Sequence, residues 1–292
     1  MFGIGALENG VFPYRPRIAH NMGVGPFGPR RKKVSFVKKV LIRLLRTPTL
    51  FPLAKGIKDW MLCRTQQGKE HRERFLQFYA GFVASGDLCF DVGASVGNRT
   101  RIFRQLGARV VCVEPQIHSA RILKRLFRNE RDVTILCCAL GEREGSGEIA
   151  ICPDSPEVSS MSKAWIESGR FSRSYDWSER QHVDVTTLDA LIAKHGVPVF
   201  CKIDVEGFEL PVIRGLSQPI PNLSFEFCRE RLTDSEKAAE YLSSLGNAAF
   251  NYSPGESLDL ALTPWVSSTE LCDKLRTADD PGLWGDIYAR FE

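Results

Sequence analysis

The strongest constraint on the fold of this chain is a regular alternation of short apolar runs and amphipathic segments that begins at residue 71. Five of the runs are apolar almost throughout, as in parallel strands buried on both faces. They lie at 88–92, 109–114, 133–139, 199–204 and 223–227. Segments with helical spacing lie between them, at 71–84, 97–106, 116–129, 187–195, 208–216 and 233–245. The pattern predicts an α/β fold in which a parallel sheet is covered by helices on both faces.

Shorter runs complete the expected elements. They predict strands near 147–152, 182–186, 248–252 and 285–291. A polar segment, 153–180, interrupts the alternation and carries Ser159, Ser160, Trp165 and Trp177. Long loops in such folds often bind substrate, so we expect this segment to form a lid or an acceptor-binding surface.

Charge divides the chain into two parts. Residues 1–72 hold fifteen Lys/Arg against three Asp/Glu, whereas residues 73–292 hold 24 against 32. Residues 1–30 are rich in Gly and Pro and have no periodicity, which is typical of a flexible leader. We therefore expect a flexible basic N-terminal arm over 1–70 and a single folded domain over 71–292.

Residues 30–46 of the arm, RRKKVSFVKKVLIRLLR, predict a basic amphipathic helix. Two interpretations stay open: the helix docks on the domain with a solvated basic face, or it contacts a membrane surface or a polyanion. Each cation near an anionic bilayer contributes about 1 kcal/mol, which is enough for transient attachment when four to eight act together.

Cellular location is indicated by what the sequence lacks. No window approaches the roughly eighteen apolar residues of a membrane span, and no signal-peptide pattern opens the chain. The nine cysteines show neither a CxxC pair nor zinc-ligand spacing. We expect a cytoplasmic protein with reduced cysteines. Any contact with a membrane would be peripheral and would be made by the arm. The sequence does not predict an oligomeric state.

The first strand ends in a loop, CFDVGASVGNRT at 89–100, that resembles a cofactor-binding turn. Gly93 and Gly97 allow a sharp turn and a close approach to a ligand. The spacing is GxxxG, and Ser95 stands where a dinucleotide fingerprint has its middle glycine. Asp91 would repel a pyrophosphate but could hold the amino group of an amino acid. A dinucleotide is therefore disfavoured.

Two further strand ends complete the expected cofactor site. Glu114 follows the second strand, where an acidic residue accepts hydrogen bonds from the two hydroxyls of a ribose. Cys138 and Ala139 close the third strand, where backbone groups would face an adenine. A ribose, an adenine and a cationic amino acid together describe S-adenosyl-L-methionine.

Three motifs carry a family resemblance. The runs FDVGASVGNRTRIFRQLGARVVCVEP, CALGEREG and FCKIDVEGFELPVIRGL resemble the FkbM family of S-adenosylmethionine-dependent methyltransferases, from about residue 75 onward. The resemblance implies a class I methyltransferase, Rossmann-like fold with a seven-stranded sheet and an antiparallel last strand. It also implies O-methylation of a hydroxyl on a sugar, polysaccharide or polyketide-like product. Ser95 departs from the family, which commonly has Asn there.

Three carboxylates are the predicted catalytic residues. Asp204 ends a central strand and Glu206 follows it, so either is a general base or an anchor for the acceptor hydroxyl. Glu226 ends the next strand and could join them. An alternative for Glu206 is purely structural, as a cap of the next helix. The three offer oxygen ligands to Mg²⁺, but no spacing defines such a site and no metal is predicted.

Other function classes fit the sequence less well than an O-methyltransferase. A nicotinamide-dependent oxidoreductase is disfavoured because the GxGxxG motif is missing and Asp91 precedes the loop. An RNA methyltransferase is disfavoured because the chain lacks an NPPY-type tetrapeptide and a Pro-Cys nucleophile, so no nucleic-acid partner is expected. The main alternative is a catalytically silent binding module that its basic arm targets to a membrane or a polyanion.

Overall fold

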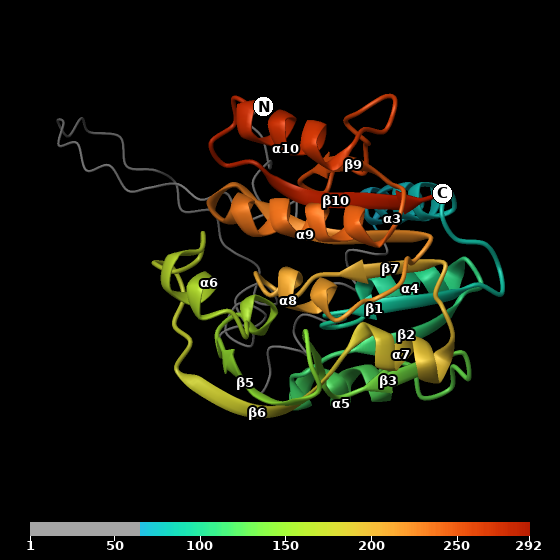
Figure 1. Ribbon diagram of the computed structural model, residues 1–292. Helices are drawn as coiled ribbons and strands as arrows, with labels where there is room; N and C mark the ends of the chain where they lie inside the picture. The colour runs from blue at the N-terminus through green and yellow to red at the C-terminus, as the bar shows by residue number, and fades with distance from the viewer. Residues whose placement is uncertain (1–64) are drawn as a thin grey trace, which may run out of the picture. The chain divides into compact units, whose positions relative to one another are not determined.

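The computed structural model describes residues 65–292, and these form an α/β domain around a seven-stranded sheet (Figure 1). The strand order is β3-β2-β1-β7-β8-β10-β9. β10 (Trp284–Phe291) runs antiparallel to both of its neighbours, and the other pairs are parallel. This topology is that of the class I methyltransferases and confirms the predicted fold. The other strands are β1 (Leu88–Val92), β2 (Arg109–Val113), β3 (Val133–Leu136), β7 (Phe200–Ile203), β8 (Asn222–Cys228) and β9 (Ala248–Pro254).

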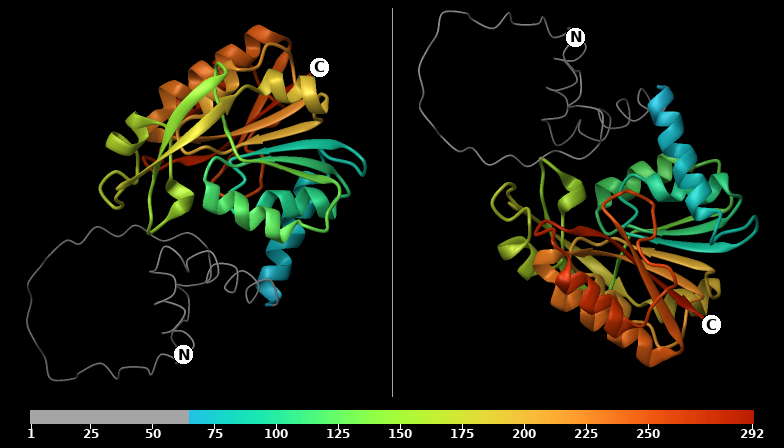
Figure 2. Two further views of the ribbon diagram at one scale, coloured as in Figure 1. Left: turned by 90° about the horizontal axis from the view of Figure 1, so that it is seen from below. Right: turned by 90° about the horizontal axis from the view of Figure 1, so that it is seen from above.

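Helices cover both faces of the sheet (Figure 2). One face carries α3 (Gln66–Tyr79), α4 (Asn98–Gln105) and α5 (Ile117–Leu126). The other carries α7 (Leu188–His195), α8 (Glu209–Arg214), α9 (Leu232–Leu245) and α10 (Ser268–Thr277). Each helical layer encloses its own apolar cluster, so the strands are buried on both sides as their composition predicts.

Strand alternation distributes side chains between the two layers. Phe90 and Val92 of β1 pack in the cluster under α7–α10, whereas Cys89 packs under α3 and α4. Since successive side chains of a strand point to opposite faces, Asp91 lies on the α3–α4 side. Lys202 of β7, two residues from Phe200, lies on the same side. Charged side chains are thereby directed toward one face of the sheet.

Several predicted elements differ from the observed ones. The run 133–139 is not one strand, because after β3 the chain leaves the main sheet. It forms a second, three-stranded sheet from β4 (Ala139–Leu140), β5 (Gly145–Ile151) and β6 (Glu179–Thr186). The helix predicted at 71–84 begins earlier, because the Thr65 side chain accepts a hydrogen bond from the backbone N–H of Gly68 and caps α3.

The segment 153–180 is more ordered than a loop. It contains η1 (Pro156–Val158) and α6 (Lys163–Ser168), and the ring of Trp165 packs against Gly207. The sequence reading also missed α10. The basic amphipathic helix predicted at 30–46 lies outside the described residues. Among residues 65–292, no helix is long and apolar enough to span a membrane.

Candidate functional site

The glycine loop after β1 is held close to the end of β7. Gly93 has a φ of 82°, and a Cβ there would lie 1.7 Å from the carbonyl oxygen of Asp204. Backbone N–H groups of Gly93 and Ala94 donate to the carbonyl of Val113 in β2. Only glycine satisfies both the dihedral angle and the space at this position.

Ser95 lies in the left-handed region, with a φ of 49°, which is uncommon for a residue other than Gly or Asn. This conformation is one that Asn adopts more readily than Ser. The backbone N–H of Ser95 donates to Oε2 of Glu114 at 2.8 Å. The loop and the end of β2 are therefore joined directly.

Glu114 is the central polar residue of the loop region and is 2% exposed. Its Oε1 accepts a hydrogen bond from the N–H of Gln116 at 2.9 Å, and its Oε2 accepts the one from Ser95. Burial raises the pKa of Glu114 to about 7, although the two backbone N–H groups oppose that rise. Each oxygen keeps a free lone pair that can accept a hydroxyl donor.

A cavity of about 530 Å³, partly open to solvent, runs along the carboxyl ends of the strands. It is lined by six of the predicted site residues, Gly93, Ser95, Glu114, Ala139, Asp204 and Glu206. Apolar side chains of Leu140, Ile149, Met161 and Phe208 complete the wall. The cavity therefore has a polar end at the loop and an apolar side.

Three residues predicted to bind the cofactor lie elsewhere. The buried carboxylate of Asp91 accepts a hydrogen bond from Oγ1 of Thr100 at 2.5 Å, under α4. A Cβ on Gly97 would meet the side chains of Leu123 and Phe127, so this glycine allows α4 and α5 to pack closely. Cys138 packs against the large apolar cluster and does not line the cavity.

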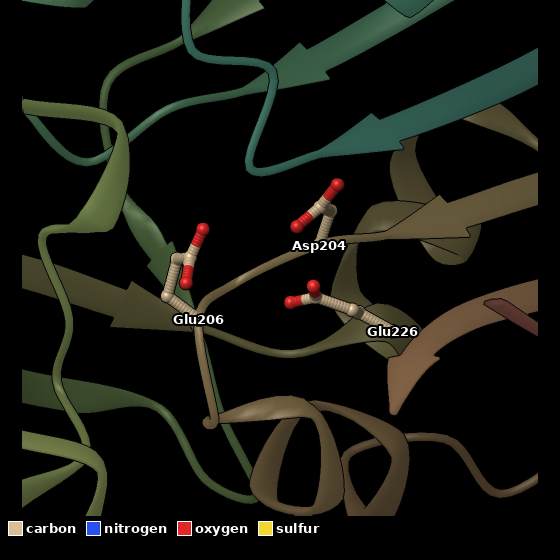
Figure 3. Close-up of side chains that lie close together, drawn as sticks. All are labelled: Asp204, Glu206 and Glu226. Atoms are coloured by element: carbon tan, nitrogen blue, oxygen red, sulfur yellow. The ribbon is translucent and has the colours of Figure 1, made fainter. Parts of the chain in front are cut away.

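Asp204, Glu206 and Glu226 come together at one end of the cavity (Figure 3). One carboxylate oxygen from each lies within 4.8 Å of the others. Asp204 and Glu206 follow β7, and Glu226 projects from β8, where it lines a neighbouring cavity of about 360 Å³. The structure therefore brings together the three residues predicted to be catalytic. It also gives them a geometry that could hold a hard divalent cation.

Two of the three carboxylates hold protons unusually tightly. Burial, followed by the charge of Glu226, raises the pKa of Glu206 well above its ordinary value. Burial, followed by the charge of Asp204, does the same for Glu226, and Arg170 opposes the rise from 3.9 Å. Oε2 of Glu206 is buried and accepts no hydrogen bond from the described residues. A second negative charge within this buried pair is therefore costly.

The turn after β7 fixes the position of Glu206. Its φ of 54° is a strained value for a glutamate. The Oγ of Ser160 donates to the carbonyl of Glu206 at 2.6 Å, and the carboxylate of Glu209 accepts N–H bonds from Val205 and Gly207. Glu209, rather than Glu206, holds this turn at the start of α8. Burial raises the pKa of Glu209 to about 7, although the hydrogen bonds from the backbone lower it.

Lys202 is a neighbour of the cluster that sequence reasoning missed. It is 1% exposed, and its Nζ lies 3.4 Å from Asp204 Oδ2 and 2.9 Å from Asp286 Oδ1. Burial alone would lower the pKa of this ammonium, but the two carboxylates outweigh it and raise the pKa. A lysine inside an otherwise apolar strand, FCKI, is a sequence signal that could have indicated a buried, charge-paired role for Lys202.

Gln116 and Met161 also line the cavity without having been predicted. Gln116 follows the second strand almost directly, so its position at the strand end could have indicated a role. Met161 comes from the segment 153–180, and no local pattern distinguishes it.

Comparison with known proteins gives one family. Residues 91–252, more than half of the chain, match the model described as the Methyltransferase FkbM domain. No functionally curated sequence matches the chain.

Solved structures with a similar arrangement are distant. An O-methyltransferase from Bacillus cereus in complex with SAH is 12% identical, with a TM-score of 0.42, and the match covers 87% of this chain and 91% of that one. A precorrin-6y C5,15-methyltransferase from Geobacter metallireducens GS-15 is 10% identical, with a TM-score of 0.41 and coverage of 76% and 87%. At such scores these likenesses carry no argument about substrate.

Proposed function

Since the chain belongs to the FkbM methyltransferase family and its cofactor is S-adenosyl-L-methionine, we propose that it methylates a hydroxyl oxygen. The observation that carries the proposal is the convergence of Asp204, Glu206 and Glu226 at the end of the cavity beside the glycine loop. A cluster of carboxylates with elevated proton affinity is suited to take a proton from an alcohol.

The residues of the cavity fit the cofactor. The Gly93 loop leaves room for a close approach, and the carboxylate oxygens of Glu114 can accept hydrogen bonds from ribose hydroxyls. Ala139 and the apolar wall offer a surface for adenine. When bound, S-adenosyl-L-methionine supplies an electrophilic methyl group.

The protein's own groups then have distinct tasks. Asp204 lines the cavity, is 42% exposed at its side chain and is held by Lys202, so it can orient an acceptor hydroxyl. Glu206 or Glu226 accepts the hydroxyl proton, because a carboxylate of ordinary pKa is a weak base toward an alcohol. Positioning of the oxygen in line with the methyl group contributes much of the rate.

The acceptor class that we propose is a sugar, a polysaccharide or a polyketide-like product, as the family resemblance implies. Polar groups of η1 and the following turn, among them Ser159 and Ser160, line the cavity near the carboxylates. Hydroxyl-rich acceptors could exchange hydrogen bonds with such a wall. Other acceptors remain outcomes of the experiment.

The test combines binding and turnover. Isothermal titration with S-adenosyl-L-methionine measures cofactor affinity, and release of S-adenosylhomocysteine with a panel of hydroxylated acceptors measures transfer. We expect Asp204→Asn to lower turnover by a factor on the order of 10² or more, with cofactor affinity nearly unchanged. The matched control is Asp279→Asn, which changes an exposed aspartate.

Three results would contradict the proposal. Absence of binding heat at high micromolar cofactor would exclude a functional cofactor site. Equal losses of affinity and turnover in Asp204→Asn would place Asp204 in the cofactor site rather than with the acceptor. Binding without transfer to any acceptor would favour the silent module.

A further inference from the structure

The carboxylate cluster of Asp204, Glu206 and Glu226 (Figure 3) is neutralised only in part. Among residues 65–292, two cations form ion pairs with it, Lys202 and Arg170. Lys202 lies 3.4 Å from Asp204 but is closer, at 2.9 Å, to a further carboxylate on β10. Arg170 is therefore the main cation available to the two glutamates, and its Nη2 lies 3.9 Å from Oε1 of Glu226.

Arg170 reaches the cluster from the segment between β5 and β6, which is distant in sequence from β8. The same segment contacts the turn after β7 at two other points. Ser160 donates a hydrogen bond to the carbonyl of Glu206, and Trp165 packs against Gly207. These contacts hold the segment against the turn, so the fold defines where the Arg170 guanidinium lies relative to the carboxylates.

Three aromatic rings surround the guanidinium of Arg170. Its Cζ lies 5.6 Å from the ring centroid of Trp165, 5.8 Å from that of Phe171 and 5.1 Å from that of Trp284. The side chain is only 17% exposed. The faces of aromatic rings attract a cation. A charge that is shielded from water also acts more strongly on a neighbouring carboxylate.

The contact between Arg170 and Glu226 is one of charge. A separation of 3.9 Å is too long for a hydrogen bond, and Nε and Nη2 of Arg170 donate no hydrogen bond to any described residue. An opposite charge at this distance favours the ionised form of a carboxylate. Arg170 does not line the cavity that fits the cofactor. It can therefore change how readily Glu226 ionises while leaving cofactor binding unchanged.

We propose that Arg170 is a positioning residue, the counter-ion that allows one carboxylate of the Glu206/Glu226 pair to ionise and take the proton of the acceptor hydroxyl. The inference rests on the proposed function, in which one of these glutamates is the base. The acceptor oxygen forms its bond to the methyl group as the carbon–sulfur bond breaks and its electron pair stays on sulfur. The hydroxyl proton passes to the ionised carboxylate, which ends the step neutral.

Charged and titratable groups from several elements surround the pair. They are Asp204 after β7, Lys202 of β7, Glu209 of α8, Asp286 of β10, Cys228 of β8, the Arg231–Asp234 ion pair beside the neighbouring cavity, and Arg170. Burial, followed by the charge of Asp204, raises the pKa of Glu226. Arg170 opposes that rise, and more strongly than Lys202 does. Burial, followed by the charge of Glu226, raises the pKa of Glu206, and Arg170 opposes this rise too. Removing the charge of Arg170 should therefore raise both pKa values.

The experiment titrates the glutamates directly in the full chain. Glutamate labelled with ¹³C at the side-chain carboxyl gives NMR signals that report ionisation, and Glu206→Gln and Glu226→Gln assign the two signals. Arg170→Gln removes the charge and Arg170→Lys keeps it. The matched control, Arg173→Gln, removes the charge of an exposed arginine in the same segment. We expect Arg170→Gln to raise the apparent pKa of the pair by about one unit or more, and the other two arginine variants to titrate like the wild type.

A second measurement separates this role from a purely structural one. Release of S-adenosylhomocysteine is followed against pH with a hydroxylated acceptor that the wild type methylates, and thermal unfolding checks that each variant is folded. In Arg170→Gln the fall of kcat/KM on the acid side should move to higher pH, with about a tenfold loss at pH 7, recovery at high pH and unchanged cofactor affinity.

Loss of turnover by the same factor at every pH, or an unchanged carboxyl titration in Arg170→Gln, would overturn the inference. A wild type whose kcat/KM does not fall on the acid side would instead contradict the base role in the proposed function. The carboxyl titration does not require methyl transfer, so it distinguishes these two failures.

Discussion

At the scale of single residues, the absence of a side chain at Gly93 allows the glycine loop after β1 to pack against the end of β7. Its backbone lies against the carbonyl of Asp204, and so it holds the glycine loop beside the end of β7, where Asp204 and Glu206 follow. Gly86 offers a comparison, because its φ of 91° is similar but nothing lies within 4 Å of the position of a Cβ.

We expect Gly86→Ala to lower the free energy of unfolding by about 1–2 kcal/mol, the cost of the left-handed conformation alone. Gly93→Ala should lower it by at least about 3 kcal/mol, because a backbone clash is added to that cost, and should abolish cofactor binding. Urea unfolding and calorimetric titration measure the two effects. Similar losses in both variants would show that the dihedral angle, and not the close approach, requires glycine at residue 93.

Glu209 makes stability depend on pH. Its pKa is about 7 in the folded protein, above the ordinary value of 4.5 for a glutamate, so the folded state binds its proton more tightly. This contribution to stability is complete below pH 4.5 and is lost as the pH rises through 7. The loss amounts to at most about 3 kcal/mol.

The variant Glu209→Gln keeps an oxygen acceptor for the N–H groups of Val205 and Gly207 but cannot ionise. We expect its free energy of unfolding to fall less than that of the wild type between pH 5 and pH 8. Glu240→Gln, at an exposed position of α9, should leave the profile unchanged. Urea unfolding at the two pH values tests this, and parallel profiles for wild type and Glu209→Gln would refute it.

At the scale of elements, Lys202 ties β7 to β10 across the strand between them. Its ammonium reaches Asp286 of β10 as well as Asp204, while β8 separates the two strands in the sheet. An ion pair in this position fixes the relative placement of the two strands. It also places a positive charge beside the carboxylate cluster.

Lys202→Met should destabilise the domain by about 3–5 kcal/mol, because it leaves Asp286 without its buried partner. The double variant Lys202→Met/Asp286→Asn should recover part of that loss. Lys237→Met, an exposed control on α9, should change the free energy of unfolding by less than about 0.5 kcal/mol. Chemical denaturation checks the series, and a Lys202→Met variant as stable as Lys237→Met would contradict it.

At the scale of the whole molecule, the domain should not need its arm. Two large apolar clusters pack against the sheet within the described residues, and the capped α3 contributes Phe75 and Tyr79 to one of them. The ring of Tyr79 packs edge-on against Phe103 and Phe200. We therefore predict that residues 65–292 are sufficient to fold and to bind the cofactor.

A fragment of residues 65–292 should unfold cooperatively and bind S-adenosyl-L-methionine within about twofold of the full chain. A fragment of residues 81–292 lacks α3, exposes Phe103 and Phe200, and should lose several kcal/mol of stability. Calorimetry and titration compare the two with the full chain. A tenfold loss of cofactor affinity in the longer fragment would show that the arm takes part in the site.

Strands could be predicted from the sequence where burial on both faces makes a run almost continuously apolar, as in 88–92. The end of β3 at Leu136 could not be predicted, because the apolar run continues through Cys137 and Cys138. The backbone hydrogen bonds after them belong to the second sheet, where β4 pairs with β6. The early start of α3 depends on a cap by Thr65, which a search for apolar periodicity does not detect.

By itself, the sequence determined the fold class, the family and the residue types of the site, because these follow from local periodicity and short motifs such as KIDVEG. Only the tertiary structure decided which of the predicted residues share a cavity. It brought Asp204, Glu206 and Glu226 together from two strands and turned Asp91 away under α4. The reason is physical: the face to which a side chain points, and the charges that it meets there, depend on packing between segments far apart in the chain.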